Sequence, residues 1–198
     1  QRFKVGFGVG LEPNRWDGHV VTTYSHKNIM GRLIKLDLRA LVGYAAMPYP
    51  WDPQEHGPIL KVAPYLQKKG WLEPKLMWTL QPSFDLGIEE GYKFTETGVR
   101  FGVSRWFRRM LMAEISYNIQ LFDFFAMLDV FKDNSTSLGK DFRDPYFLSF
   151  LELGLKAYFT DRIMEPRNGV ILESKLAASG FYLGSMFDYV KLTPEVKG

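Results

Sequence analysis

The sequence of 198 residues contains no cysteine, which excludes disulfides, thiolate metal sites and cysteine nucleophiles. Long hydrophobic runs are also missing, since the longest uncharged stretches cover residues 41–51 and 176–187. Both are shorter than the roughly 18 to 20 apolar residues that a membrane-spanning helix needs. The chain is therefore not a helical membrane protein. A strand of a membrane barrel needs only about 9 to 11 residues, with every second one apolar, and therefore fits a slightly negative mean hydropathy.

Runs of like charge are missing as well. The 25 Lys and Arg and 22 Asp and Glu residues give a net charge of +3 and are scattered singly. A nucleic-acid surface usually shows clustered basic residues, so we expect no nucleic-acid partner. We also expect no enzyme activity, with no catalytic residue, no metal site and no cofactor. Asp52, Glu55 and His56 could form a metal or acid–base cluster, but their proline-rich surroundings favour a solvated loop.

Aromatic residues are abundant, at 16% of the chain, and many segments alternate apolar and polar residues. The clearest segment is 111–122, where Ile115, Tyr117 and Ile119 alternate with Ser116 and Asn118. Alternation with period two is typical of a β-strand with two different faces. Similar segments occur at 33–44, 59–66, 76–86, 95–104, 147–159 and 170–178, and a last strand opens near residue 189.

The polar positions of these segments carry charges of both signs. We expect these residues to face a water-filled, ion-paired interior, where charge balancing explains them better than catalysis. They are Lys35, Asp37, Arg39, Glu96, Arg100, Glu114, Glu152, Lys156, Glu173 and Lys175.

Turn formers separate the segments, and they predict nine or ten strands in one meander. The main predicted loops are 13–18, 48–58, 129–145 and 161–169. Short turns at 28–32, 67–70, 106–109 and 162–168 would be periplasmic, and long segments near 46–58 and 123–146 would face outward. A soluble β-sandwich would also alternate. Tyr and Trp near the strand ends, together with Gly and Ser beside paired charges, favour a transmembrane antiparallel up-and-down β-barrel.

Three motifs occur in the order found in one known family. Residues 24–31 read Tyr-Ser-His-Lys-Asn-Ile-Met-Gly, residues 63–66 read Ala-Pro-Tyr-Leu, and residues 160–162 and 166–169 read Thr-Asp-Arg and Pro-Arg-Asn-Gly. Together they resemble turns of the BamA/TamA superfamily of outer-membrane insertases and translocases. The resemblance covers nearly the whole chain. It implies insertion or translocation of proteins at the bacterial outer membrane, with unfolded outer-membrane proteins as substrates and lipid and lipopolysaccharide as surroundings.

The chain also departs from the pattern of that family. Members have POTRA domains before a barrel of about sixteen strands, and neither a POTRA domain nor the Arg-Gly-Phe tripeptide of their inward loop is visible here. The chain ends at Gly198 rather than at an aromatic residue. We therefore expect residues 1–198 to be the N-terminal portion of a larger outer-membrane barrel. The remaining strands would come from the same chain or from a partner chain.

The resemblance implies that the first strand forms a weak seam with the last and that substrate strands add there. The candidate is residues 3–11, with Phe3, Val5, Phe7, Val9 and Leu11 toward lipid and Lys4, Gly6, Gly8 and Gly10 inward. Glycine weakens a strand and lets another backbone approach. An alternative reading is that these glycines only relieve crowding in the lumen. A dinucleotide loop is excluded because no helix pattern follows.

One cluster suggests a membrane interface. Arg105, Trp106, Phe107, Arg108 and Arg109 would place aromatics at headgroup depth and cations near lipid phosphates. A charged hairpin without any partner explains the same residues equally well. Three functions remain open: an insertase or translocase, a pore or uptake barrel or a structural subunit of an outer-membrane complex, and a less expected enzyme at the barrel rim.

Overall fold

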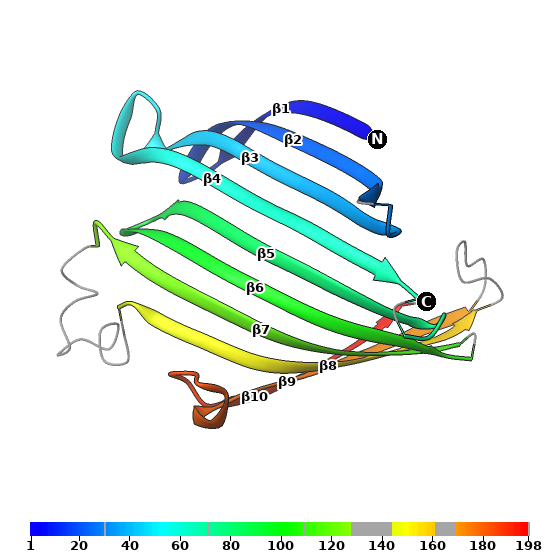
Figure 1. The fold of residues 1–198 in the computed structure, drawn as a ribbon. Helices are drawn as coiled ribbons and strands as arrows, with labels where there is room; N and C mark the ends of the chain where they lie inside the picture. The colour runs from blue at the N-terminus through cyan, green and yellow to red at the C-terminus, as the bar shows by residue number, and fades with distance from the viewer. Residues whose placement is uncertain (30, 71, 109, 128–143, 161–168, 198) are drawn as a thin grey trace.

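The computed structural model describes residues 1–29, 31–70, 72–108, 110–127, 144–160 and 169–197. Ten antiparallel strands form one up-and-down sheet in which each strand pairs with the next (Figure 1), which confirms the predicted meander. The strands are β1 (Arg2–Glu12), β2 (Arg15–Ile29), β3 (Ile34–Tyr49), β4 (Asp52–Lys69), β5 (Leu76–Glu89), β6 (Tyr92–Phe107), β7 (Leu111–Phe125), β8 (Tyr146–Thr160), β9 (Gly169–Ser179) and β10 (Tyr189–Lys197), with a 3-10 turn η1 (Phe181–Leu183) before the last. Among the residues that the structure describes, none belongs to a helix long and apolar enough to span a bilayer.

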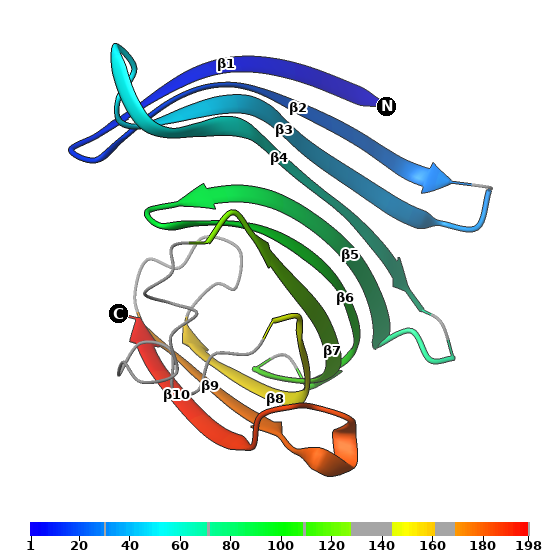
Figure 2. The same ribbon diagram turned by 90° about the vertical axis from the view of Figure 1, so that its left-hand side faces the viewer.

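The sheet is curled but not closed. Figure 2 shows β1 and β10 at its two free edges, well apart from each other. Contacts between strands that are not neighbours indicate which face is concave. Arg15 of β2 lies 3.6 Å from Glu89 of β5, and Arg100 of β6 lies 2.8 Å from Glu152 of β8. Such contacts form on the inside of a curve, so we call the face that bears Arg15 and Arg100 the inner face.

The register assigns the apolar residues to the opposite, outer face. Directly paired residues of an antiparallel ladder point to the same side. Val99 pairs with Ile119, and Tyr117 pairs with Leu151, so the apolar positions of neighbouring strands form one continuous surface. Large side chains on it are exposed, with Phe101 at 44%, Ile115 at 53% and Leu153 at 44%.

The protein core is correspondingly small. Among the described residues, the buried apolar side chains are Ala45, Ala46, Met47, Ile59, Ile88 and Ala177. Soluble domains of this length normally bury a large apolar core. Here a continuous apolar surface lies on the outside of the curve and the ion pairs lie inside, together with an aromatic cluster near the strand ends at Phe122, Phe124 and Tyr146.

Two of the predicted loops were wrong. Within residues 13–18 the turn consists of Pro13 and Asn14 alone. The strand β2 begins directly after it, because Arg15 already pairs with Glu12. Residues 48–58 are mostly strand, because β3 runs to Tyr49 and β4 begins at Asp52. The predicted short strand 59–66 is therefore β4, which reaches Lys69. Prolines caused this error, since each blocks the hydrogen bond to only one neighbouring strand, and a β-bulge between Met47 and Pro48 absorbs the change in register.

These strands define two rims. Rim A carries the turns 13–14, 50–51 and 90–91 and the connections 126–145 and 180–188, and rim B carries the turns 30–33, 70–75 and 108–110. Of the two long segments that we expected on the outward side, 46–58 is a strand hairpin, whereas 123–146 includes the end of β7 and the start of β8 and otherwise joins these two strands at rim A. Residues 128–143 of that connection, like residues 162–168 of the predicted periplasmic turn, lie outside the described residues.

The segment from 180 to 188 covers part of the outer face near rim A. The backbone carbonyl of Leu183 accepts hydrogen bonds from the Tyr117 hydroxyl, at 3.2 Å, and from the Ser149 hydroxyl. The backbone N–H of Met186 donates to Phe147 O at 3.0 Å. Ser149 is consequently fully buried, so a polar residue on the outer face has its partner within the protein.

Candidate functional site

The inner face carries all ten predicted lumen charges, because the register places them on the same side of the sheet. The central group spans three strands. Arg100 of β6 donates to Glu114 of β7 at 3.0 Å and to Glu152 of β8 at 2.8 Å. Cross-strand pairing of opposite charges keeps the two carboxylates from repelling each other. Gln120 donates to Glu96 at 3.1 Å beside this group.

Other ion pairs continue along the same face. Glu173 of β9 lies 3.3 Å from both Lys156 and Lys175. Lys35 lies 2.5 Å from Asp37, which also accepts a hydrogen bond from Ser25. Of the ten charges, Arg39 and Glu96 make no ion pair within the described residues. Apart from the aromatic cluster near rim A, the inner surface is thus strongly polar, and most of its charges are neutralised by ion pairs.

Hollows of molecular size open on this face. One of about 490 Å³ is lined by Asp37, Arg39, Tyr65 and Gln81, among others. A second of about 250 Å³ lies over the Arg100 group and is lined by Asn118 and Glu152 as well. Charged and amide groups that line such spaces can hold water or bind small polar solutes.

The predicted seam strand is β1, which pairs only with β2 in this structure. Its outward residues are highly exposed, with Phe3 at 64%, Val5 at 49%, Phe7 at 85%, Val9 at 74% and Leu11 at 63%. The backbone groups on its other side have no partner strand among the described residues. An apolar edge of this kind readily pairs with another strand.

The glycines of β1 differ from one another. A side chain at Gly8 would collide with the His19 ring, and one at Gly10 would collide with the Asp17 carboxylate. Gly6 has open space around the position of a Cβ. Gly8 and Gly10 therefore make room for the side chains of β2, as the crowding interpretation expected, and only Gly6 leaves the inner side of the edge open.

Sequence reasoning missed the residues that fill this space. His19 Nδ1 lies 2.6 Å from Asp17 Oδ2, and Arg15 lies 3.8 Å from the same carboxylate. All three were assigned to, or beside, a loop. Their spacing at alternate positions was the available signal, because it places them on one face of a strand.

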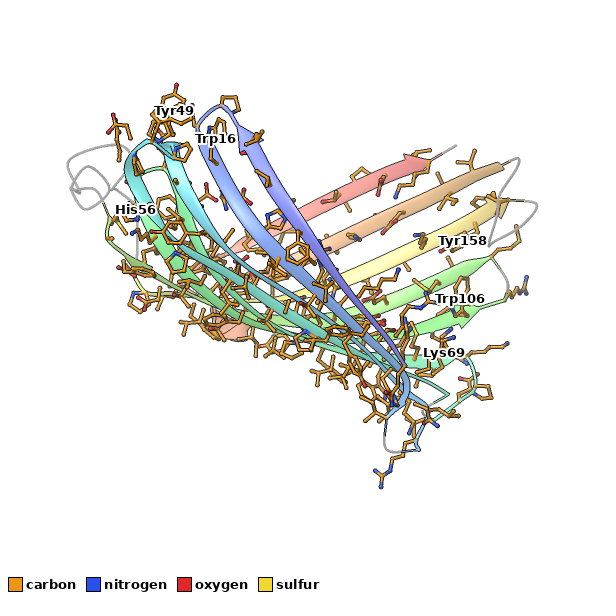
Figure 3. The ribbon with its side chains drawn as sticks, turned by 90° about the horizontal axis from the view of Figure 1, so that it is seen from above. Trp16, Tyr49, His56, Lys69, Trp106 and Tyr158 are labelled. Carbon is orange, nitrogen blue, oxygen red and sulfur yellow. The ribbon has the colours of Figure 1, made fainter. Side chains whose placement is uncertain are left out.

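Aromatic residues gather at both rims (Figure 3). At rim A, the Trp51 ring lies 5.5 Å from Trp16 and 5.2 Å from Tyr49. At rim B, Trp106 stacks on Tyr158 at 5.6 Å, and the register places both rings on the inner face, beside Lys156. Trp16 lies on the outer face, where aromatic rings are enriched at the water–lipid interfaces of membrane proteins.

The predicted interfacial cluster lies at rim B. Arg105 is 2.9 Å from Glu73 and sits 5.0 Å from the centre of the Phe107 ring. Trp106 belongs to the stack with Tyr158, and Arg108 is exposed in the turn. Arg109 lies outside the described residues. The cluster is therefore divided between the two faces, with Arg105 and Phe107 on the outer face and Trp106 on the inner face.

The rims also differ in charge. Near the turns of rim A most charged residues are acidic, and Arg15 and Lys93 are the exceptions. The acidic residues there include Glu12, Asp52, Glu89 and Glu90. Near the turns of rim B most charged residues are basic, and Glu73 is the exception. The basic residues there include Arg32, Lys68, Lys69, Lys75, Arg105 and Arg108. In the described part of the sheet, rim A is therefore mainly negative and rim B mainly positive.

The possible metal cluster lies in β4 rather than in a loop. Asp52, Glu55 and His56 occupy one hairpin, but His56 Nδ1 lies 2.5 Å from the Tyr44 hydroxyl. In the part of the chain that the structure describes, no three His, Cys, Asp or Glu side chains are grouped to hold a metal ion.

Comparisons of the chain with protein families, with curated proteins and with solved structures found no match.

Proposed function

We propose that this chain forms part of an outer-membrane β-barrel of the BamA/TamA type, which inserts or translocates other proteins at the bacterial outer membrane. The carrying observation is the arrangement of the sheet, with apolar side chains outside and ion pairs inside. This is the reverse of a soluble sandwich and suits a wall between hydrocarbon and water. The two free edges would then be completed by further strands of the same chain or of a partner.

Strand β1 supports the translocation part of the proposal. Backbone donors and acceptors that face hydrocarbon without a partner cost several kcal/mol each, so an exposed edge must find a strand. An incoming extended segment would satisfy these groups by β-augmentation. The outward stripe from Phe3 to Leu11 would at the same time match the apolar side of that segment.

The rims support a membrane orientation. Basic rim B, with Arg105 and Phe107 on the outer face, suits anionic lipid headgroups. Short turns occur at both rims, but the long connections 126–145 and 180–188 lie at rim A, and outer-membrane barrels carry their long loops on the extracellular side. We therefore place rim B at the periplasmic interface and rim A, with its long connection 126–145, at the lipopolysaccharide side.

Paired cysteine variants on neighbouring residues test the membrane placement. In the full protein in lipid vesicles, Gly154→Cys should react with a water-soluble maleimide and Leu153→Cys should not. Gly154 points to the inner face and accepts a Cβ at ordinary contact distance, whereas Leu153 lies on the outer face at 44% exposure. Equal labelling of both residues would contradict the membrane placement.

A photocrosslinking pair tests the role of β1. A benzoylphenylalanine at Phe7, on the edge strand, should crosslink to an unfolded outer-membrane protein during its assembly. The matched control is Ile115, which is also exposed on the outer face but lies in the interior strand β7 and should crosslink only to lipid. Equal client crosslinking at both positions would contradict entry at the edge.

The second candidate function is a pore, and the hollows beside Arg39 and Arg100 favour it. A pore would conduct ions in a planar bilayer with a selectivity that changes in an Arg39→Glu variant. It would show no client crosslink at Phe7. The two readouts together separate the pore from the insertase.

A further inference from the structure

The ladder between β4 and β5 is interrupted in its middle. Pairing joins Leu60–Val62 to Phe84–Leu86 and Leu66–Lys69 to Met77–Leu80, and the same register resumes after the gap. Residues 63–65 and 81–83 are unpaired across this boundary. We call the boundary between the two strands the β4/β5 seam.

Two opposed prolines cause the interruption. The register places Pro64 directly opposite Pro82, and neither has an N–H to donate. Each strand stays fully paired on its other side at the same height, where Pro64 pairs with Leu38 and Pro82 pairs with Val99. The backbone nitrogens of both prolines therefore face the β4/β5 seam, so the two hydrogen bonds are lost there and not on the side of β3 or β6.

The end of the seam near rim A is held by side chains instead of a ladder. Residues 52–59 of β4 have no partner on β5, and Pro58 lies within this stretch. The Ile88 side chain, only 1% exposed, fills the space against Gly57. Side-chain packing is thus the local substitute for backbone bonds.

Two cations cap backbone carbonyls there. Lys93 Nζ donates to His56 O at 2.9 Å, and Arg15 Nη1 donates to Ile88 O at 3.3 Å. Arg15 reaches β5 from β2 across the inner face. The caps satisfy acceptors that the neighbouring strand leaves unpaired, and they do so without joining the two backbones.

We propose that the wall opens laterally along the β4/β5 seam, in the interior of the sheet and independently of the edge at β1. Local opening follows the weakest set of backbone bonds, and among the described ladders this one alone loses three consecutive pairs in its middle, whereas the β2/β3 and β3/β4 ladders shift register only near their ends. The hollow beside Asp37, Arg39, Tyr65 and Gln81 lies against the interruption. Opening would therefore connect the inner, polar side of the wall with its apolar surroundings.

Amide hydrogen exchange of the full protein in detergent micelles tests the proposal. The amides of Leu66 and Leu80, beside the gap, should exchange at least about tenfold faster than those of Val99 and Ile119. The latter pair lies at the same height in the uninterrupted ladder of β6 and β7. Equal protection of the two pairs would overturn the proposal.

A variant that restores the missing donors gives an independent test. Pro64→Val with Pro82→Val should slow exchange at Leu66 and Leu80 by about tenfold, since two backbone bonds can then form. Pro194→Val is the matched control, because Pro194 pairs with Ser174 in an uninterrupted ladder and its missing donor points to the free edge; it should change nothing at the seam. An unchanged rate in the double variant would overturn the assignment of the weakness to the prolines.

Removal of a cap tests the end near rim A. Lys93→Met should speed exchange at Leu86 several-fold and leave Val99 unchanged, because only the carbonyl of His56 loses its donor. These rates do not involve any client protein or any lipid contact of β1. Failure of the seam proposal is therefore distinguishable from failure of the proposed function.

Discussion

The pairs β4/β5 and β6/β7 belong to the same sheet and show the same alternation, yet they are built differently. Strand β6 pairs from Lys93 to Phe107 without interruption, whereas β4 pairs with β5 only at Leu60–Val62 and Leu66–Lys69. Arg100 adds ion pairs across β6, β7 and β8. The comparison teaches that alternation decides which face a residue occupies, while prolines and cross-strand charges decide how firmly neighbouring strands are joined.

The largest effect on stability is expected when the positive charge of Arg100, which links β6, β7 and β8, is removed. Arg100→Met should lower the free energy of unfolding by about 2 kcal/mol, because Glu114 and Glu152 then face each other without a cation. The pair is only partly buried, which keeps the cost below that of a fully buried one. Urea titration of the protein in lipid vesicles measures the change. A loss no greater than that in the Lys61→Met variant described below would remove the contrast between the two strand pairs.

A smaller effect is expected from overpacking the inner face of β6. Gly98→Val should cost about 1 to 2 kcal/mol, because a Cβ at this position would lie 2.9 Å from Ser83 Oγ and 3.3 Å from the backbone oxygen of Ile119. Gly6→Val is the control, since Gly6 has open space and should change stability by less than about 0.5 kcal/mol. The same urea titration compares them. Equal costs would mean that the inner face near β7 is no more tightly packed than the edge.

The smallest effect on stability is expected at the β4/β5 seam. Lys61 bridges β4 and β5 to Asp85 at 2.5 Å, but its side chain is 63% exposed. Lys61→Met should therefore cost no more than about 0.5 kcal/mol, as is usual for exposed ion pairs. Repeating the titration at high salt should abolish the difference. A cost above that of Arg100→Met would show that charge, rather than proline, governs the seam.

The sequence predicted the faces of the strands well. Ile115, Tyr117 and Ile119 lie on the outer face, and Glu114 and Asn118 lie on the inner face, as the alternation indicates. This works because side chains on a strand point to opposite sides in turn, whatever the strand pairs with. The charges of the candidate site follow from the same rule.

The turns were predicted less well. Residues 48–58 contain several prolines and were assigned to a loop, whereas they form the hairpin of β3 and β4. A proline excludes a hydrogen bond in one direction only, and the direction depends on the register. Asp17 was assigned to the predicted loop 13–18 for a different reason, because its strand begins at Arg15, earlier than the turn signal indicated.

By itself, the sequence determined the class of the protein: an antiparallel meander with one apolar and one charged face, since period two is a local property of an extended backbone. Only the tertiary structure decided which residues meet. The approach of Arg100 to Glu152 requires the curl of the sheet, the burial of Ser149 requires the return of segment 180–188 over the outer face, and the gap in the β4/β5 ladder requires Pro64 to face Pro82. Each depends on register and curvature, which are set by pairing between segments distant in the chain.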